Sequence, residues 1–130
     1  MLLVDDLETN RFLLEEALGG IDAEILTAGS GAEALAIFAD VRPAVVVVDF
    51  QMPSMSGAET SRRIKQARAP YTYLILTSGY REAEESASFG ASLADRFLPK
   101  PYRIEDVRAS VEEGLRIALE KRGQTTFPRD

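Results

Sequence analysis

Short apolar runs alternate with longer amphipathic stretches along most of the chain. The apolar runs, of which VVVVDF is the clearest, lack the polar alternation of a half-exposed strand and are typical of strands covered on both faces. The stretches between them carry apolar residues at helical spacing, and the first of these ends at Gly19 and Gly20. The pattern therefore indicates strands and helices in turn.

The alternation predicts five strands and five helices. Strands are expected at residues 2–6, 23–28, 43–50, 71–79 and 96–101. Helices are expected at residues 7–20, 30–40, 57–68, 82–92 and 104–122. Because a helix follows each strand, neighbouring strands run parallel, and we expect an α/β fold with a doubly wound five-stranded parallel sheet.

The last predicted helix carries a stripe of apolar residues four positions apart: Val107, Val111, Leu115 and Leu119. The final residues, GQTTFPRD, show no period. We therefore expect one domain at residues 1–121, followed at 122–130 by a tail or the start of a linker.

Composition supports a single domain and narrows its partners. A chain of 130 residues with 45% hydrophobic content is long enough for one core. Its 21 acidic and 15 basic residues give a net charge of −6, which argues against a nucleic-acid or anionic-membrane partner. No apolar run approaches the length of a membrane span, and the opening MLLVDD is too short for a secretory signal, so we expect a cytoplasmic protein.

The chain contains no cysteine and no histidine. This excludes disulfides, thiol nucleophiles, zinc sites with the usual ligands and any mechanism that needs an imidazole from this chain. Carboxylates, hydroxyls and lysine are left to supply the chemistry.

Polar residues of these types gather where the predicted strands end. The carboxyl ends of parallel strands share one edge of a sheet, so these residues are expected to meet there. They are Asp5 and Asp6 after the first strand, Asp49 at the end of the third, Thr77 and Ser78 in the fourth, and Lys100 after the fifth. Three carboxylates about 5 Å apart repel by roughly 3 kcal/mol per pair at an effective dielectric constant near 20. Lys100 offsets part of this repulsion, and a divalent cation with oxygen ligands, preferably Mg²⁺, would offset more.

Each of these residues also has a structural interpretation. Asp5 could cap the first helix, Lys100 could be a surface lysine and Ser78 could satisfy its own turn. These residues form a shared site only if they converge at one edge of the sheet.

Four motifs resemble those of the receiver domains of two-component response regulators. They are LLVDD, VVVVDFQMPSMSG, LILTSGY and RFLPKPY, and the resemblance extends from Met1 to about Leu119. It implies a flavodoxin-like sheet with the strand order 2-1-3-4-5.

The resemblance also implies a role for each residue. Asp49 is then the phosphorylation site, and Asp5 and Asp6 bind Mg²⁺ together with Asp49 and the backbone carbonyl of Gln51. Lys100 would contact the phosphoryl group. Leu7 departs from the family pattern, because a third acidic residue is frequent at that position.

A hydroxyl and an aromatic residue would act as the switch. Of the two hydroxyl candidates, Ser78 fits the family's spacing to Lys100 better than Thr77, and Phe97 matches the aromatic residue. Supporting positions are Thr77, Pro53, Gly57 and Pro101, and the resemblance implies a cis peptide before Pro101.

The implied function is signalling. A histidine kinase or a histidine phosphotransfer protein would phosphorylate the domain, which catalyses only its own phosphorylation and dephosphorylation. The surface formed by the fourth helix, fifth strand and fifth helix would then change and act on an effector domain or a second copy of the chain.

Two other classes fit the sequence less well. A haloacid-dehalogenase-like phosphatase would need a second aspartate two residues after Asp49, where this chain has Gln51. A flavodoxin-type ligand-binding domain would need a hydroxyl-rich phosphate loop after the first strand, where Asp5 and Asp6 would repel phosphate. A receiver that has lost phosphorylation is a third alternative, although every position that the chemistry needs is filled.

Overall fold

The computed structural model describes residues 1–52, 55–67, 70–79 and 94–125. The strands are β1 (Leu2–Val4), β2 (Leu26–Ala28), β3 (Val45–Asp49), β4 (Tyr73–Ser78) and β5 (Arg96–Pro99). The helices are α1 (Glu8–Ala17), α2 (Gly31–Val41), α3 (Gly57–Gln66) and α5 (Ile104–Thr125). The fourth helix predicted at residues 82–92 lies outside the described residues.

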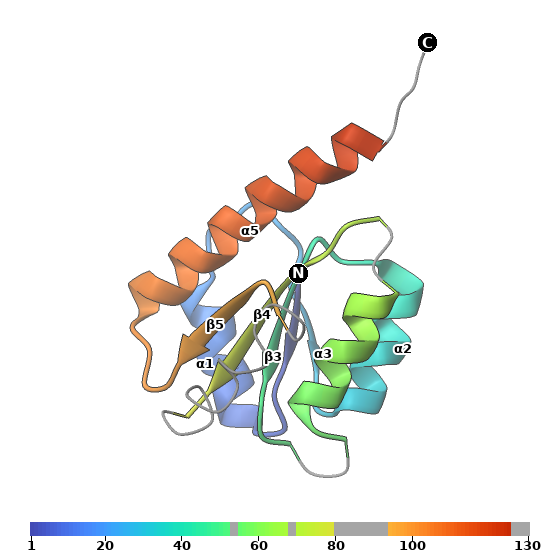
Figure 1. Ribbon diagram of the computed structural model, residues 1–130. Coiled ribbons are helices and arrows are strands. Elements are labelled where there is room, and N and C mark those ends of the chain that lie inside the picture. Colours follow the sequence, from blue (N-terminus) through green and yellow to red (C-terminus); the bar gives the residue numbers. More distant parts are fainter. Residues whose placement is uncertain (53–54, 68–69, 80–93, 126–130) are drawn as a thin grey trace.

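The five strands form one parallel sheet in the order β2-β1-β3-β4-β5, which confirms the predicted fold. Helices α1 and α5 cover one face of the sheet, and α2 and α3 cover the other (Figure 1). The four valines of β3 explain why both faces must be covered. Val45 and Val47 pack in a core with α1 and α5, whereas Val46 and Val48 pack in a second core with α2 and α3.

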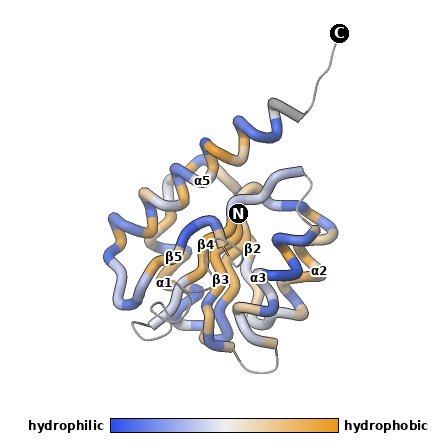
Figure 2. The backbone as a smooth tube through the Cα atoms, viewed as in Figure 1, coloured by the Kyte–Doolittle hydropathy of each residue, from blue (hydrophilic) through white to orange (hydrophobic). Residues whose placement is uncertain are grey.

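Hydrophobic residues are concentrated in the strands, and hydrophilic residues in the outer parts of the helices (Figure 2). All residues of β1, β3 and β4 are buried. These strands hold the residues at their carboxyl ends in fixed positions, because a close-packed interior resists displacement of the strands. Within the described residues, no helix is long and apolar enough to cross a membrane.

One prediction about the last helix needs correction. On α5, Val107 and Val111 are buried but Leu119 is 61% exposed, and Ala118 takes the inner position instead. Steps of four residues advance by about 40° more than a full turn of an α-helix, so the predicted stripe leaves the core within a few steps.

The end of α5 also differs from the prediction. The helix continues to Thr125, three residues beyond its predicted end at Arg122. The Arg122 guanidinium donates hydrogen bonds to the carbonyl oxygens of Tyr71 (2.7 Å), Arg42 (2.9 Å) and Pro43 (3.1 Å). These contacts hold the last turns of α5 on the loops before β3 and β4. The sequence period could not indicate them because their acceptors are backbone atoms.

The start of α3 lies directly against the end of β3. The Gly57 amide donates to the Phe50 carbonyl (2.8 Å), and the Ser56 hydroxyl caps the helix by accepting from the Glu59 amide (3.1 Å). A methyl group on Gly57 would overlap with the Asp49 carbonyl oxygen and lie 2.6 Å from the Phe50 Cα. Only glycine therefore permits this approach.

We predict that Gly57→Ala lowers the free energy of unfolding by about 2 kcal/mol, the usual cost of forcing an extra carbon into a packed site. Urea unfolding measures the change. The control is Gly123→Ala on α5, where a Cβ meets no atom within 4 Å and the better helix former should leave stability unchanged or slightly raised. Equal stability of Gly57→Ala and the wild type would contradict this packing.

Candidate functional site

The structure brings the predicted polar residues to one edge of the sheet. Asp49 is the last residue of β3 and pairs in register with Thr77 of β4. Ser78, the next residue, pairs with Pro99 of β5, and Lys100 follows directly. The site therefore lies where β1, β3, β4 and β5 end.

Three carboxylates meet at this edge. Asp5, Asp6 and Asp49 each offer an oxygen atom that lies within 4.8 Å of the other two. Asp5 and Asp49 are almost fully buried, at 3% and 6% exposure. Mg²⁺ and Ca²⁺ are the cations that such an all-oxygen set suits. Because the carboxylates converge without having to move far, the donor set fits the divalent cation that the sequence predicts.

Asp5 is held in place by the residues that follow it. Its carboxylate accepts hydrogen bonds from the Leu7 amide (3.0 Å) and the Asn10 side chain (3.3 Å), and its carbonyl accepts one from Arg11 (2.6 Å). Its amide donates to the Ala28 carbonyl of β2 (3.1 Å). Asp5 thus contacts the start of α1 without capping it, because the N-cap residue is Leu7 and no side chain caps the helix, and Asp5 also joins the acidic cluster.

Lys100 is the cation that faces Asp49. Its ammonium lies 2.8 Å from Asp49 Oδ1. Burial raises the pKa of Asp49, the hydrogen bond from Lys100 acts against this, and the charges of Asp5 and Asp6 raise it further. Burial by itself would lower the pKa of Lys100, but the hydrogen bond and charge of Asp49 outweigh it and raise that pKa. One ammonium therefore stabilises the Asp49 carboxylate only in part.

The two hydroxyl candidates in β4 differ in their contacts. Thr77 Oγ1 lies 3.5 Å from the Val48 carbonyl, whereas the buried Ser78 Oγ has no hydrogen-bond partner among the described residues. The backbone at this end of β4 is fixed on both sides. The backbone amide of Phe50 donates to the Thr77 carbonyl (2.7 Å), and the backbone amide of Lys100 donates to the Ser78 carbonyl (2.6 Å). A buried hydroxyl without a partner costs free energy, so Ser78 is placed to gain from any acceptor that arrives beside it.

The other predicted residues surround this centre at greater distance. Phe97 on β5 is half-buried against the core of α2 and α3. Gln51 is exposed and, with Asp6, lines a hollow of about 430 Å³ beside the acidic cluster. The Lys100–Pro101 peptide is cis, and Pro53 lies outside the described residues. The roles assigned to these residues stay predictions.

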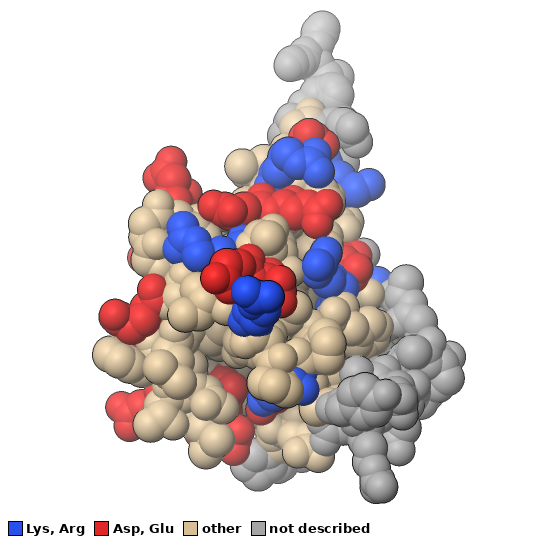
Figure 3. All heavy atoms as spheres, turned by 90° about the vertical axis from the view of Figure 1, so that its left-hand side faces the viewer, with Lys and Arg blue, Asp and Glu red and all other residues tan. Residues whose placement is uncertain are grey.

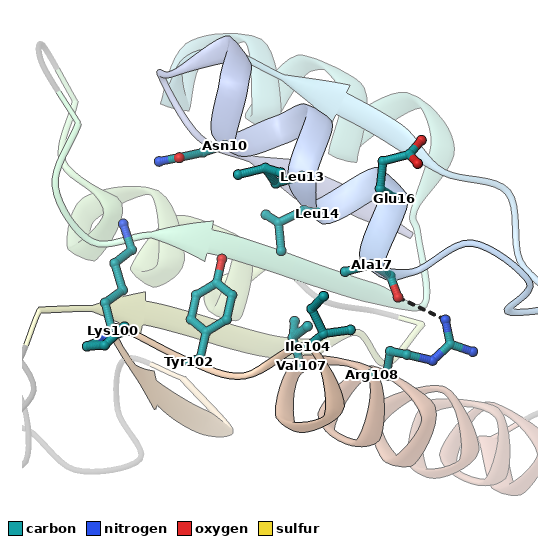
Figure 4. A pocket seen from close by; sticks show the side chains of 11 residues that line it. Asn10, Leu13, Leu14, Glu16, Ala17, Lys100, Tyr102, Ile104, Val107 and Arg108 are labelled. Carbon is teal, nitrogen blue, oxygen red and sulfur yellow. Dashed lines mark hydrogen bonds between the residues drawn. The ribbon is translucent and has the colours of Figure 1, made fainter.

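A cavity of about 810 Å³ opens between α1 and α5, next to the acidic cluster (Figure 4). Leu13 and Leu14 of α1 face Tyr102, Ile104 and Val107 across it, and Lys100 and Asn10 stand at one end. At the other end, Arg108 donates to the Ala17 carbonyl (2.8 Å) and joins the two helices. Sequence reasoning missed this cavity and the polar residues Asn10 and Tyr102. The only sequence signal for the cavity was that α1 carries more apolar residues than can face the core of the sheet.

The exposed side of α5 is covered with paired charges. Figure 3 shows acidic and basic side chains close together on this side of the molecule. Arg116 pairs with Glu120 (3.2 Å) and Glu113 (4.0 Å), and Arg96 of β5 also pairs with Glu113 (3.4 Å). These ion pairs link β5 to α5 on the surface that the sequence analysis assigned to partners.

Comparison with known proteins identifies the family. The model of the response regulator receiver domain matches residues 1–112. The DNA-binding transcriptional regulator NtrC of Escherichia coli (strain K12) is 34% identical over 113 residues, which cover 87% of this chain and 24% of NtrC. The response regulator MprA of Mycobacterium sp. (strain KMS) is 34% identical over 116 residues, which cover 89% of this chain and 50% of MprA. The chain thus spans about a quarter to a half of the length of these relatives.

A solved structure agrees with these matches. The receiver domain of a response regulator from Clostridium thermocellum superposes with a TM-score of 0.82 at 26% identity, covering 92% of this chain and 95% of that one. The family match at residues 1–112 includes all five strands of the sheet and the acidic cluster. The chain belongs to the family of response regulator receiver domains.

Proposed function

We propose that this domain takes up a phosphoryl group on Asp49 and passes a phosphorelay signal on by changing the surface around β5 and α5. The observation that carries the proposal is the setting of Asp49, whose carboxylate lies 2.8 Å from the Lys100 ammonium within a cluster of three aspartates. Receiver domains of response regulators, the family to which this chain belongs, act in signalling.

Asp5, Asp6 and Asp49 would hold Mg²⁺, with the backbone carbonyl of Gln51 as a further ligand. The bound ion would neutralise charge on the cluster and on the phosphoryl oxygens during transfer. The residues themselves supply a compact set of carboxylate oxygens, of which those of Asp5 and Asp49 are nearly buried. This degree of burial strengthens every charge interaction at the site.

The chemical step is a transfer between two nucleophiles. An oxygen of the Asp49 carboxylate attacks the phosphorus atom of a phosphohistidine. The P–O bond forms as the P–N bond breaks, and the electron pair of that bond returns to the imidazole of the donor. Lys100 Nζ, which now donates to Asp49 Oδ1, would donate to a phosphoryl oxygen instead. Hydrolysis of the acyl phosphate by water restores the carboxylate, and these two reactions are the only catalysis we assign to the domain.

Phosphorylation would then move Ser78. Its buried hydroxyl lacks a partner among the described residues, and a phosphoryl oxygen would supply the acceptor. A hydrogen bond to a charged group contributes about 1.5 to 3 kcal/mol. This is a large part of the few kcal/mol needed to make the less populated of two conformations the dominant one. The end of β4 would shift, and Phe97 on the neighbouring β5 would turn inward. The face formed by β5 and α5 would change as a result.

The partners follow from this scheme. A histidine kinase or a histidine phosphotransfer protein in the cytoplasm would donate the phosphoryl group. NtrC and MprA extend well beyond the part that resembles this chain, and NtrC is described as a DNA-binding transcriptional regulator. We therefore propose that the altered face acts on an effector domain or forms a homodimer.

The proposal predicts labelling at a single residue. Incubation with acetyl phosphate and Mg²⁺ should add one phosphoryl group to the wild type, and mass spectrometry of the intact chain and its peptides should place it on Asp49. Asp49→Asn should stay unlabelled, because its amide is not a nucleophile. The matched control is Asp95→Asn, a half-buried aspartate whose carboxylate accepts from the Leu74 amide and lies outside the acidic cluster. Equal labelling of Asp49→Asn and the wild type would refute the assignment.

The switch predicts a second result. Beryllofluoride, a stable substitute for the phosphoryl group on aspartate, should change amide exchange at Ser78, at Phe97 and at residues 82–92. The changes away from Asp49 should shrink in Ser78→Ala. Thr77→Val serves as the control because it removes the neighbouring hydroxyl, whose carbonyl contact is long. Changes confined to residues that touch Asp49 would mean that the domain binds the group without signalling through this face.

A further inference from the structure

Both carboxylate oxygens of Asp5 receive a hydrogen bond from the start of α1. Oδ1 accepts from the Leu7 amide (3.0 Å), and Oδ2 accepts from Asn10 Nδ2 (3.3 Å). The backbone amide of Leu7 is present whatever side chain stands there. Among the described residues, the Asn10 amide is the one donor to this carboxylate that a substitution can remove without changing the acidic cluster itself.

Asn10 stands at a position where packing alone would favour an apolar residue. It lines the cavity between α1 and α5 together with the apolar Leu13 and Leu14, and its amide lies at the end of the cavity where the Lys100 ammonium also lies (Figure 4). Asparagine is a poorer helix former than leucine or alanine. Its polar contact with Asp5 is therefore what the position gains from it.

Asn10 and Lys100 act on the cluster in different ways. Lys100 brings a positive charge to Asp49, which competes with a bound cation for the same carboxylate. The neutral amide of Asn10 fixes the direction of the Asp5 carboxylate and brings no competing charge. Partners of this kind, which hold a ligand without touching the metal, commonly change metal affinity by about 10- to 100-fold when removed.

We propose that Asn10 is a positioning residue for the cation site and acts through Asp5. The inference rests on the proposed function, because it requires that Asp5, Asp6 and Asp49 bind Mg²⁺. Asn10 keeps the Asp5 carboxylate turned toward the cluster in the metal-free protein. The site is thereby organised before the ion arrives.

The test is a Mg²⁺ titration of the whole chain, followed by backbone-amide NMR, together with thermal unfolding in EDTA. Asn10→Leu keeps the branching and the number of heavy atoms in the side chain but removes the donor, and Asn10→Ala removes it with a smaller side chain. Both should raise the dissociation constant for Mg²⁺ about tenfold, the lower end of the usual range. The metal-free melting temperature reports the cost of leaving Asp5 without this donor, which the helix preference of leucine and alanine offsets in part. Leu13→Asn, which places an amide elsewhere on the wall of the same cavity, should leave the dissociation constant unchanged.

Three results would overturn the inference. If Mg²⁺ binds the Asn10 variants as tightly as the wild type, the hydrogen bond is structural only and the proposed function stands without it. If Leu13→Asn weakens binding as much as Asn10→Leu, the effect belongs to α1 in general and not to the contact with Asp5. If the wild type does not bind Mg²⁺, the inference and the cation site of the proposed function both fail.

Discussion

Repulsion among three carboxylates is the constraint on which the rest of this domain depends. Asp5, Asp6 and Asp49 place oxygen atoms within 4.8 Å of one another, and two of these residues are nearly buried. At such distances each ionised pair repels by roughly 3 kcal/mol even at an effective dielectric constant near 20. Lys100 supplies one opposing charge, at Asp49. The site is therefore built to gain from a further cation and from the chemistry that the cation supports.

The fold provides the stiffness that keeps these charges together. The valines of β3 are buried on both faces of the sheet, so Asp49 cannot retreat from the edge without disturbing two cores. Gly57 brings the start of α3 against the Asp49 backbone from behind. Hydrogen bonds from the backbone amides of Phe50 and Lys100 hold the end of β4, where the Ser78 hydroxyl lies. The proposed switch requires such rigid surroundings, because packed elements shift between discrete arrangements and do not deform continuously.

Sequence patterns could predict the sheet and its polar edge because both depend on local periods. An unbroken valine run requires cover on both faces, and parallel strands must end at one edge. Patterns could not indicate features that depend on how distant segments meet. The contact between Asn10 and Asp5, the cavity walled by Leu13 and Ile104, and the carbonyls that hold Arg122 are of this kind. The exposure of Leu119 shows that even a correct helix can be assigned the wrong inner face toward its end.

The protonation of Asp49 tests the central constraint most directly. Titration of its carboxyl carbon by ¹³C NMR in metal-free protein, assigned by comparison with Asp49→Asn, should give a pKa above the usual value for aspartate, because burial and the two neighbouring carboxylates outweigh Lys100. A pKa raised by folding means that the metal-free domain loses stability as the pH rises through that pKa. Added Mg²⁺ should lower the pKa, since it favours the ionised form. A pKa at or below the usual value, or one that Mg²⁺ leaves unchanged, would contradict the account.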